Sequence, residues 1–266
     1  MRKKTVDRRF AITGFFSAFG FEWSPEFVFR GESHEMWEIV FIKGGKVEVT
    51  EDESVYMLER DNMILHAPWE FHRIRSAQRT SPSGHIISFY TEGELPERLR
   101  EGIFVLSTEQ RLRYSEICDR IKGFLRSDSP SPYTGQEIAS SLECFLIELS
   151  GEAVSAHADT GASATEYRKL VVAMSQSVCD NKTLSDFAAE CADSVSYIKQ
   201  LFYKNAGISP KSYYNNLRVR YAARLLDEGI SVGEIAERMN FSSSNYFSAF
   251  FKKHTGVSPL DYKRKA

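Results

Sequence analysis

Two histidines and a glutamate in the first third of the chain have side chains that could bind a metal ion. His34 lies four residues before Glu38, and His72 ends a Pro68-x-x-x-His72 segment. Two imidazoles and one carboxylate together suit divalent iron, manganese or zinc. The same residues could instead line a pocket without metal. We adopt the second interpretation and expect neither a metal nor a cofactor.

Aromatic and basic residues stand close to these three in the sequence. Trp37 directly precedes Glu38, and Arg75 follows His72 by three positions. Aromatic surface with a few polar groups is typical of a small-molecule pocket, although it is equally common in a core. The candidate pocket is therefore formed by His34, Trp37, Glu38, His72 and Arg75.

A second region of functional interest is an internal repeat in residues 183–266. Its first copy contains Tyr197-Ile198, Phe202, Gly207-Ile208-Ser209-Pro210 and Tyr213. Every one of these positions has a counterpart of matched chemistry 49 residues later: Tyr246-Phe247, Phe251, Gly256-Val257-Ser258-Pro259 and Tyr262. A repeat of this kind predicts a duplicated structural unit.

Each copy has the pattern of two helices joined by a tight turn. Thr183 to Asp186 and Ser231 to Glu234 have the form of capping boxes, and Ser194 can cap the second helix of the first copy. Asn240 stands where the second turn requires a left-handed backbone. Apolar residues recur at helical spacing in both copies: Leu184, Phe187, Ala188, Cys191, Ile198, Leu201 and Phe202, then Val232, Ile235, Ala236, Met239, Phe247, Phe250 and Phe251.

A helix over 210–227 is predicted between the copies, since Ser209-Pro210 suits its start and Gly229 its end. Eighteen helical residues span about 27 Å, slightly less than the roughly 34 Å between successive major grooves on one face of DNA. The charge distribution also favours a polyanionic partner for this part of the chain. From Ala164 onward there are 15 Lys and Arg against 10 Asp and Glu, whereas the residues before it contain 19 Lys and Arg against 26 Asp and Glu. Two helix-turn-helix units on a rigid spacer therefore predict duplex DNA as the partner, and the alternative is a plain helical bundle.

Residues 183–264 resemble the DNA-binding domain of the AraC/XylS family. The most telling stretch is I-A-x-x-x-x-F-x-x-x-x-Y-F-x-x-F-F-K-K-x-x-G-V-S-P, which begins at Ile235. The resemblance implies that the second helix of each unit enters the major groove, with DNA-binding positions Ser194, Ser196, Lys199 and Gln200 in the first unit and Ser244, Asn245, Ser248, Ala249 and Lys252 in the second. Lys204, Arg218, Lys252 and Lys253 are expected to contact phosphate or to form a solvated face.

Two residues depart from the family pattern. Ala249 stands where many relatives have Arg, and Asp193 occupies a turn position that is usually apolar. The first departure implies that the second unit reads bases weakly or through a thymine methyl group, and the other implies looser packing of the first unit.

The first hundred residues have the alternation and turn signals of short strands, which predict a sandwich or small barrel. We expect Glu38–Ile42 and Lys46–Thr50 to form a hairpin, and Phe10–Phe21 to be a first strand behind a basic arm and not a secretory signal. The segments around His34 and His72 resemble the cupin-type barrel that precedes the DNA-binding domain in many AraC-family regulators. Enzymatic cupins usually have H-x-H before the acid, whereas position 32 here is Glu.

The predicted fold has two domains: an all-β cupin-like barrel followed by helices, and an all-α domain whose two helix-turn-helix motifs are joined by a long helix. The expected boundaries are 1–106 for the barrel, 107–150 for two helices, 151–164 for a linker and 165–266 for the DNA-binding domain, with its units at 183–207 and 231–255. The two helices either cover the sheet or form a dimerisation surface. Their expected apolar stripes are Leu112, Ile117, Ile121 and Leu125, then Ile138, Leu142, Phe145, Leu146 and Leu149.

Composition excludes other classes of protein. No apolar run reaches the 18 residues that would suggest a membrane span, and the four scattered cysteines are expected to be buried helical thiols in a reducing compartment.

The sequence thus predicts a bacterial cytoplasmic transcription regulator that binds double-stranded promoter DNA. The resemblance implies an activator that contacts RNA polymerase, is not an enzyme, and is a possible homodimer controlled by a small-molecule effector in the barrel. Two alternatives are a metal-dependent cupin enzyme with a DNA-binding appendage and a regulator controlled by a partner protein.

Overall fold

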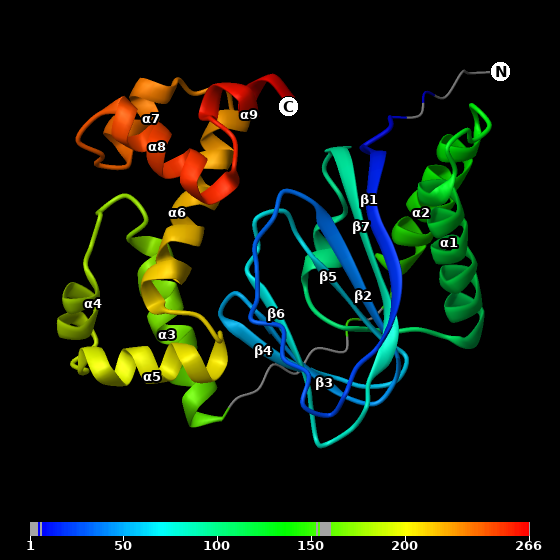
Figure 1. Cartoon of the computed structure of the whole chain (residues 1–266), viewed down its shortest axis with the longest axis horizontal. Coiled ribbons are helices and arrows are strands. Elements are labelled where there is room, and N and C mark those ends of the chain that lie inside the picture. The colour runs from blue at the N-terminus through cyan, green and yellow to red at the C-terminus, as the bar shows by residue number, and fades with distance from the viewer. Residues whose placement is uncertain (1–4, 6, 153, 155–160, 266) are drawn as a thin grey trace.

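The computed structural model describes residues 5, 7–152, 154 and 161–265, and Figure 1 shows a β domain flanked by two sets of helices. The β domain contains two antiparallel sheets. The five-stranded sheet has the order β1 (Phe10–Glu22), β7 (Ser83–Gly93), β2 (Trp37–Gly44), β5 (Asn62–His66) and β8 (Phe104–Val105). The three-stranded sheet has the order β4 (Ser54–Leu58), β3 (Val47–Glu51) and β6 (His72–Ser76).

The two sheets pack face to face. Side chains such as Val40 and Ile86 from the larger sheet share one buried apolar cluster with Val49 and Ile74 from the smaller one. The predicted β domain is therefore present as two packed sheets with a first strand from Phe10, and closure into a cupin-like barrel stays a prediction. Part of the predicted basic arm, Arg2–Arg9, lies outside the described residues.

The predicted hairpin between Glu38–Ile42 and Lys46–Thr50 is wrong, because β2 and β3 belong to different sheets. β2 is buried on both faces from Trp37 to Ile42 and pairs with β5 and β7 on its two edges. The turn after β2 instead carries the chain across to the second sheet. Gly45 allows this crossing with φ of 72°, and its Cα lies so close to Pro82 that an added Cβ would be 2.6 Å from the proline Cα.

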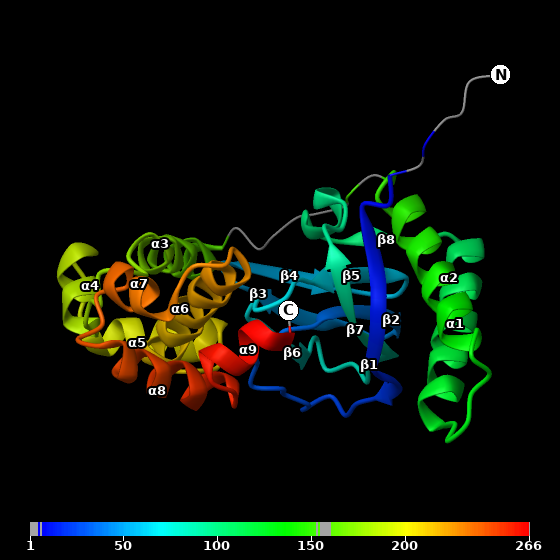
Figure 2. The same cartoon turned by 90° about the horizontal axis from the view of Figure 1, so that it is seen from above.

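Helices α1 (Thr108–Arg126) and α2 (Thr134–Leu149) follow a short 3₁₀ helix, η1 (Glu97–Arg100), and cover the outer face of the larger sheet (Figure 2). The predicted stripe on α2 is buried: Ile138, Leu142, Phe145, Leu146 and Leu149. The covering role is thus observed, and a dimerisation surface on the outer side stays a prediction.

The predicted stripe on α1 is partly wrong, since Leu112 and Leu125 are 69% and 40% exposed. Ile117 is five positions after Leu112, so these side chains point about 140° apart around a helix. The buried face has the regular spacing of Tyr114, Ile117, Cys118 and Ile121.

Seven helices form the described part of the carboxy-terminal domain. They are α3 (Ala162–Gln176), α4 (Leu184–Glu190), α5 (Val195–Asn205), α6 (Pro210–Asp227), α7 (Val232–Arg238), α8 (Ser244–Thr255) and α9 (Pro259–Lys265). α3 was not predicted, and it begins inside the segment expected to be a linker, of which residues 153 and 155–160 lie outside the described chain. Its buried residues Tyr167, Leu170, Val171 and Met174 pack in the core of the first helix-turn-helix unit.

The long helix α6 belongs to the cores of both units. Tyr213 and Leu217 on its first half pack with α4 and α5, and Ala222 and Leu226 on its second half pack with α7 and α8. Because one continuous helix is embedded in both cores, it fixes the two units relative to each other.

The helix ends follow the predicted capping chemistry in part: the box at Thr183 is complete, whereas at Ser231 the Glu234 side chain does not bond back to the cap. Thr183 and Asp186 form a complete capping box, and the Ser194 and Ser231 hydroxyls accept hydrogen bonds from backbone amides of the following turn. The Glu234 carboxylate binds Arg238 at 2.6 Å. Asn240 has the expected left-handed backbone, with φ of 54°.

The cysteine prediction is only partly correct. The four thiols are free, but Cys144 is exposed on α2, and only Cys118 is fully buried. Among the described residues, no helix has the length and apolar character needed to span a lipid bilayer.

Candidate functional site

The predicted recognition helices α5 and α8 lie on the same side of α6 and are displaced along it, as Figures 1 and 2 show together. Their DNA-binding positions face outward: Ser194, Ser196, Lys199, Gln200, Ser244, Asn245, Ala249 and Lys252 are exposed, and Ser248 is half-buried. Within the described part of the chain, no hydrogen bond or ion pair engages the side chains of Lys199, Gln200 or Asn245. These groups are therefore available to base edges.

Buried apolar residues, three of them aromatic, set this orientation. Ile198 and Phe202 on α5 and Phe247 and Phe251 on α8 are completely buried, so the opposite side of each helix must face solvent. The Ser194 and Ser243 hydroxyls accept from the third backbone amide of each helix at 3.1 Å. Ser194 thus has a structural role as a cap, and its contact with DNA stays a prediction.

Arg218 is not a phosphate contact, as the sequence suggested, because it is only 4% exposed. Its guanidinium donates to Asn181 Oδ1 at 2.7 Å and to the Met239 carbonyl at 2.8 Å, and lies 4.3 Å from the centre of the Phe241 ring. The arginine therefore links the segment before the first unit to the turn of the second. A basic residue on a helix gives no sequence signal that distinguishes such a link from a solvated face.

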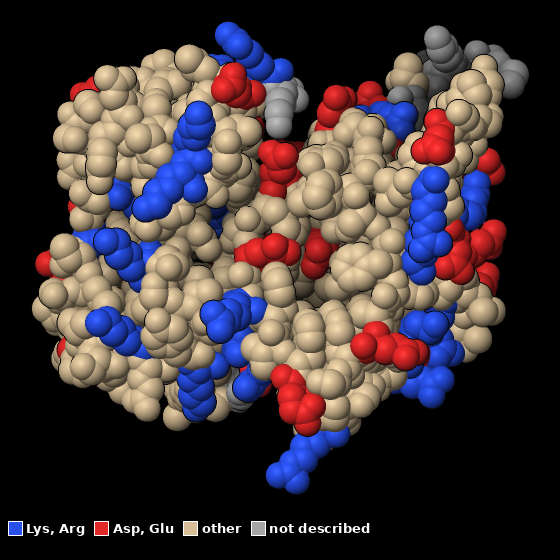
Figure 3. Space-filling model, in the orientation of Figure 1, with Lys and Arg blue, Asp and Glu red and all other residues tan. Residues whose placement is uncertain are grey.

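The other predicted phosphate contacts, Lys204, Lys252 and Lys253, are exposed. Figure 3 shows Lys and Arg side chains spread over the DNA-binding domain on the face turned to the viewer, with few carboxylates among them. This face could approach a polyanion without strong repulsion.

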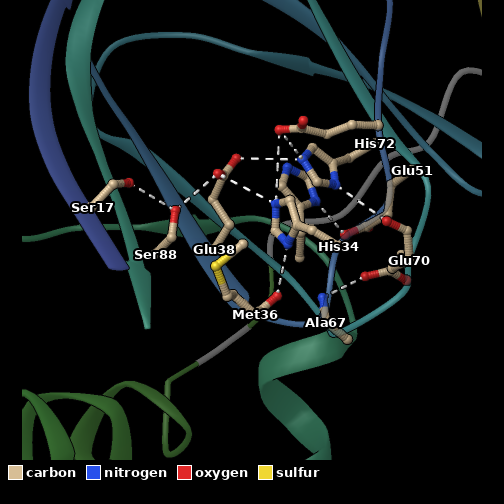
Figure 4. A network of polar contacts seen from close by, with 11 residues as sticks. Ser17, His34, Met36, Glu38, Glu51, Ala67, Glu70, His72 and Ser88 are labelled. Atoms are coloured by element: carbon tan, nitrogen blue, oxygen red, sulfur yellow. Dashed lines mark hydrogen bonds and ion pairs between the residues drawn. The ribbon is translucent and has the colours of Figure 1, made fainter. Parts of the chain in front are cut away.

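The β domain brings His34, Glu38 and His72 together (Figure 4). It also adds Glu32, which the sequence prediction did not include. Glu38 lies on β2, His72 begins β6, and the backbone of Glu32 forms reciprocal 3.0 Å hydrogen bonds with that of His72. His34 and Glu32 precede β2. Glu32 could have been identified from the sequence, since it occupies the first position of the H-x-H pattern and has a carboxylate in place of an imidazole.

Charge in this cluster depends on burial and on its neighbours. Burial opposes ionisation of Glu38, but the surrounding histidines outweigh it and lower its pKa to about 2. Burial lowers the pKa of His72 to about 4. Burial also opposes protonation of His34, yet Glu38 and Glu32 raise its pKa overall.

Two other predicted pocket residues lie elsewhere. Trp37 alternates with Glu38 along β2, so its ring packs in the core between the larger sheet and α1 and α2, on the opposite face. Arg75 alternates with the inward-facing Ile74 and forms a double hydrogen bond at 2.7 Å with Glu48 on β3. The period-two rule could have excluded Trp37 from the sequence alone.

A second polar cluster adjoins the first. The His66 ring stacks on that of His72 with centroids 4.4 Å apart, and His66 Nδ1 is 3.0 Å from a carboxylate oxygen of Glu51. Burial raises the pKa of Glu51 to about 8 and lowers that of His66 to about 4, so both groups are neutral near pH 7. Glu70 completes this cluster.

Asp52, next to Glu51, is the centre of the contact between the domains. Its carboxylate accepts from the Tyr213 hydroxyl at 3.1 Å and pairs with Arg220, and its carbonyl accepts from the Tyr167 hydroxyl at 2.8 Å. Nearby, Thr50 donates to the Asn205 carbonyl at 2.6 Å.

Comparison with known proteins supports the DNA-binding assignment. Residues 187–265 match a family described as a helix-turn-helix domain. The chain is 22% identical over 263 residues to YisR of Bacillus subtilis, an uncharacterized helix-turn-helix transcriptional regulator, covering 88% of this chain and 90% of YisR. It is 34% identical over 98 residues to the transcriptional regulatory protein HptR of Staphylococcus aureus, covering 37% of this chain and 39% of HptR.

A solved structure of ToxT from Vibrio cholerae O395 aligns over 96% of this chain and 97% of ToxT, at 15% identity and a TM-score of 0.40.

The fold of the carboxy-terminal domain and its sequence matches define a helix-turn-helix transcription regulator that binds DNA. Residues 187–265 therefore carry the helix-turn-helix domain that the AraC-like sequence motifs predicted.

Proposed function

We propose that this chain activates transcription from promoter sites that α5 and α8 recognise together. The observation that carries the proposal is the outward, same-side arrangement of two recognition helices on one spacer helix. The spacer helix α6 is about 27 Å long, slightly less than the roughly 34 Å between successive major grooves on one face of DNA. Both recognition helices can therefore reach adjacent major grooves of one duplex. Activation, contact with RNA polymerase in the cytoplasm, and pairing of two copies rest on resemblance to the family.

The β domain is proposed to be a cupin-like barrel that binds an effector. Its interior holds a polar cluster between the sheets, and this cluster lies close to the residues that contact the DNA-binding domain. An effector can shift DNA occupancy only if it binds two states of the protein with different affinity. A site adjoining the domain contact meets this requirement better than a site remote from it.

Genome-wide footprinting of the full-length protein, combined with transcript measurement in a deletion strain, tests this proposal. We expect protected sites upstream of promoters, and lower transcript levels from those promoters after deletion. No enrichment at promoters would contradict the role in transcription, and higher transcript levels would contradict activation.

A further inference from the structure

We propose that Glu32, His34, Glu38 and His72 bind one divalent transition-metal ion, and that this ion is the effector of the N-terminal domain. The effector role deepens the proposed regulatory function and rests on it. The site itself does not, because it is argued from the geometry of the β domain. It also reverses the expectation from the sequence that this cluster holds no metal.

The separations between the four side chains fit donors that share an ion. His72 Nε2 lies 3.5 Å from a Glu38 oxygen and 3.9 Å from a Glu32 oxygen, and His34 Nε2 lies 3.7 Å and 3.9 Å from oxygens of the same two residues. Donors bound about 2.1 Å from one metal at angles of 90° to 180° are about 3.0 to 4.2 Å apart. All four distances lie in that range.

Both imidazoles are oriented as metal ligands. His34 Nδ1 lies 3.1 Å from the Met36 carbonyl, and His72 Nδ1 lies 3.2 Å from the Glu70 carbonyl. A carbonyl can only accept, so each Nδ1 carries a proton, and in the neutral ring each Nε2 presents a lone pair. Both Nε2 atoms are buried and have no hydrogen-bond partner among the described residues. Two buried lone pairs that converge on two carboxylates are costly unless a cation lies between them.

The carboxylates complete the site and indicate its metal class. Glu38 accepts a 3.2 Å hydrogen bond from Ser88, which in turn is bonded to Ser17, so its orientation is supported. The Glu32 side chain is 50% exposed, which leaves a route for the ion from solvent. Two nitrogen and two oxygen donors without sulfur favour manganese, iron, nickel or zinc over calcium and over copper(I).

The site is connected to the DNA-binding domain through two short paths. His72 pairs with Glu51 across β3 and β6, and the first residue after β3, Asp52, contacts Arg220 and Tyr213 of α6. The residue after His72, Arg73, donates to the Asn205 carbonyl at the end of α5 at 3.0 Å. An ion that draws His72 towards Glu32 and Glu38 therefore acts on both strand ends that hold the first helix-turn-helix unit.

Titration of the full-length protein with Mn²⁺, followed by loss of the electron paramagnetic resonance signal of the free ion, tests the site. We expect one ion per chain, and at least about tenfold weaker binding by Glu32→Gln and by His72→Gln. Glu32 is half-exposed, so its variant stays folded even if the variant of buried His72 does not. Exposed Glu26 and buried His85 lie outside the cluster, so Glu26→Gln and His85→Gln should bind as the wild type does. No Mn²⁺ binding, or equal binding by Glu32→Gln, would overturn the site.

The effector role is tested by DNA affinity at fixed ionic strength, on a duplex that the full-length protein selects from a random pool. We expect Mn²⁺ to change the affinity of the wild type and of His85→Gln by about fivefold or more, and that of Glu32→Gln by much less. Bound Mn²⁺ with unchanged DNA affinity would overturn the effector role alone. A chain that binds Mn²⁺ but selects no duplex would overturn the regulatory function and leave the metal site standing.

Discussion

The two helix-turn-helix units share one plan but have different surroundings. Both have serine-capped recognition helices and buried aromatic anchors, and both share α6. The core of the first unit includes Phe71 of the β domain, and its Tyr213, Asn205 and Tyr167 form polar contacts with that domain.

The second unit has far fewer such contacts. Its described hydrogen bond to the β domain runs from Trp69 Nε1 to the Tyr262 hydroxyl at 3.2 Å. A cleft of about 910 Å³, lined by residues such as Glu35, Tyr90 and Asp227, separates it from the rest of that domain. Figure 3 shows the hollow between the two domains. We infer that a signal from the β domain reaches DNA through the first unit, and that the second unit supplies binding that depends less on that signal.

The largest effect is expected from Arg218→Ala, which should damage both units. The change removes the two hydrogen bonds that the buried guanidinium donates, and leaves Asn181 Oδ1 and the Met239 carbonyl without this donor. The free energy of unfolding should fall by roughly 2 to 4 kcal/mol. Chemical denaturation measures this, with exposed Arg224→Ala on the same helix as the control. A loss no larger than that of the control would mean that the two units are joined by α6 alone.

Asp52→Asn should loosen the first unit and spare the second. Asparagine keeps the shape and tolerates the left-handed φ of 42°, but removes the charge that faces Arg220. We expect the variant to lose roughly 1.5 to 3 kcal/mol of the free energy that stabilises the domain contact. Hydrogen exchange should be accelerated more in α5 than in α8 relative to the wild type. The control is Asp119→Asn, which affects an exposed ion pair on α1. Equal acceleration in α5 and α8 would contradict the difference between the units.

Glu51→Gln should change how stability depends on pH. The folded pKa of about 8 lies above the ordinary value of 4.5, so the protonated form stabilises the fold. This contribution is complete below about pH 4.5 and is lost as the pH rises through 8. Between pH 5 and 8 the wild type should therefore lose roughly 1 to 3 kcal/mol of unfolding free energy relative to Glu51→Gln. Denaturation at several pH values measures the difference, and parallel curves would contradict it. Exposed Glu59→Gln is the control.

The smallest effect is expected from Lys252→Ala, an exposed residue of the second unit. Loss of one phosphate contact should reduce the slope of log affinity against log salt concentration by about one and leave base preference unchanged. Lys169 lies on α3, so Lys169→Ala should not change the slope. Altered base preference would show that Lys252 contacts bases instead.

Local features of the fold could be predicted from the sequence, and distant ones could not. The caps at Thr183 and Ser209 and the extent of α6 depend on neighbouring residues, so their signals are local. The pairing of β2 depends on which strands approach it from elsewhere in the chain, and the hairpin prediction failed for that reason.

The same division holds for the site. His34, Glu38 and His72 were recognised as a group, but Glu32 was passed over because the expected residue type was histidine. The role of Arg218 depends on Asn181 and Met239, which are distant in sequence, and no spacing pattern connects these residues.

The central claim is that α5 and α8 occupy successive major grooves on one face of the same duplex. The most direct measurement is base-by-base substitution of a selected duplex, with the affinity of wild type, Lys199→Ala and Asn245→Ala determined for each substitution. Each variant should lose about 1 to 3 kcal/mol of binding free energy for the selected duplex. Each should also cease to discriminate between bases within its own short block of base pairs, and the two blocks should lie about one helical turn apart. Loss of discrimination in the same block, or unchanged affinity for both variants, would contradict the account.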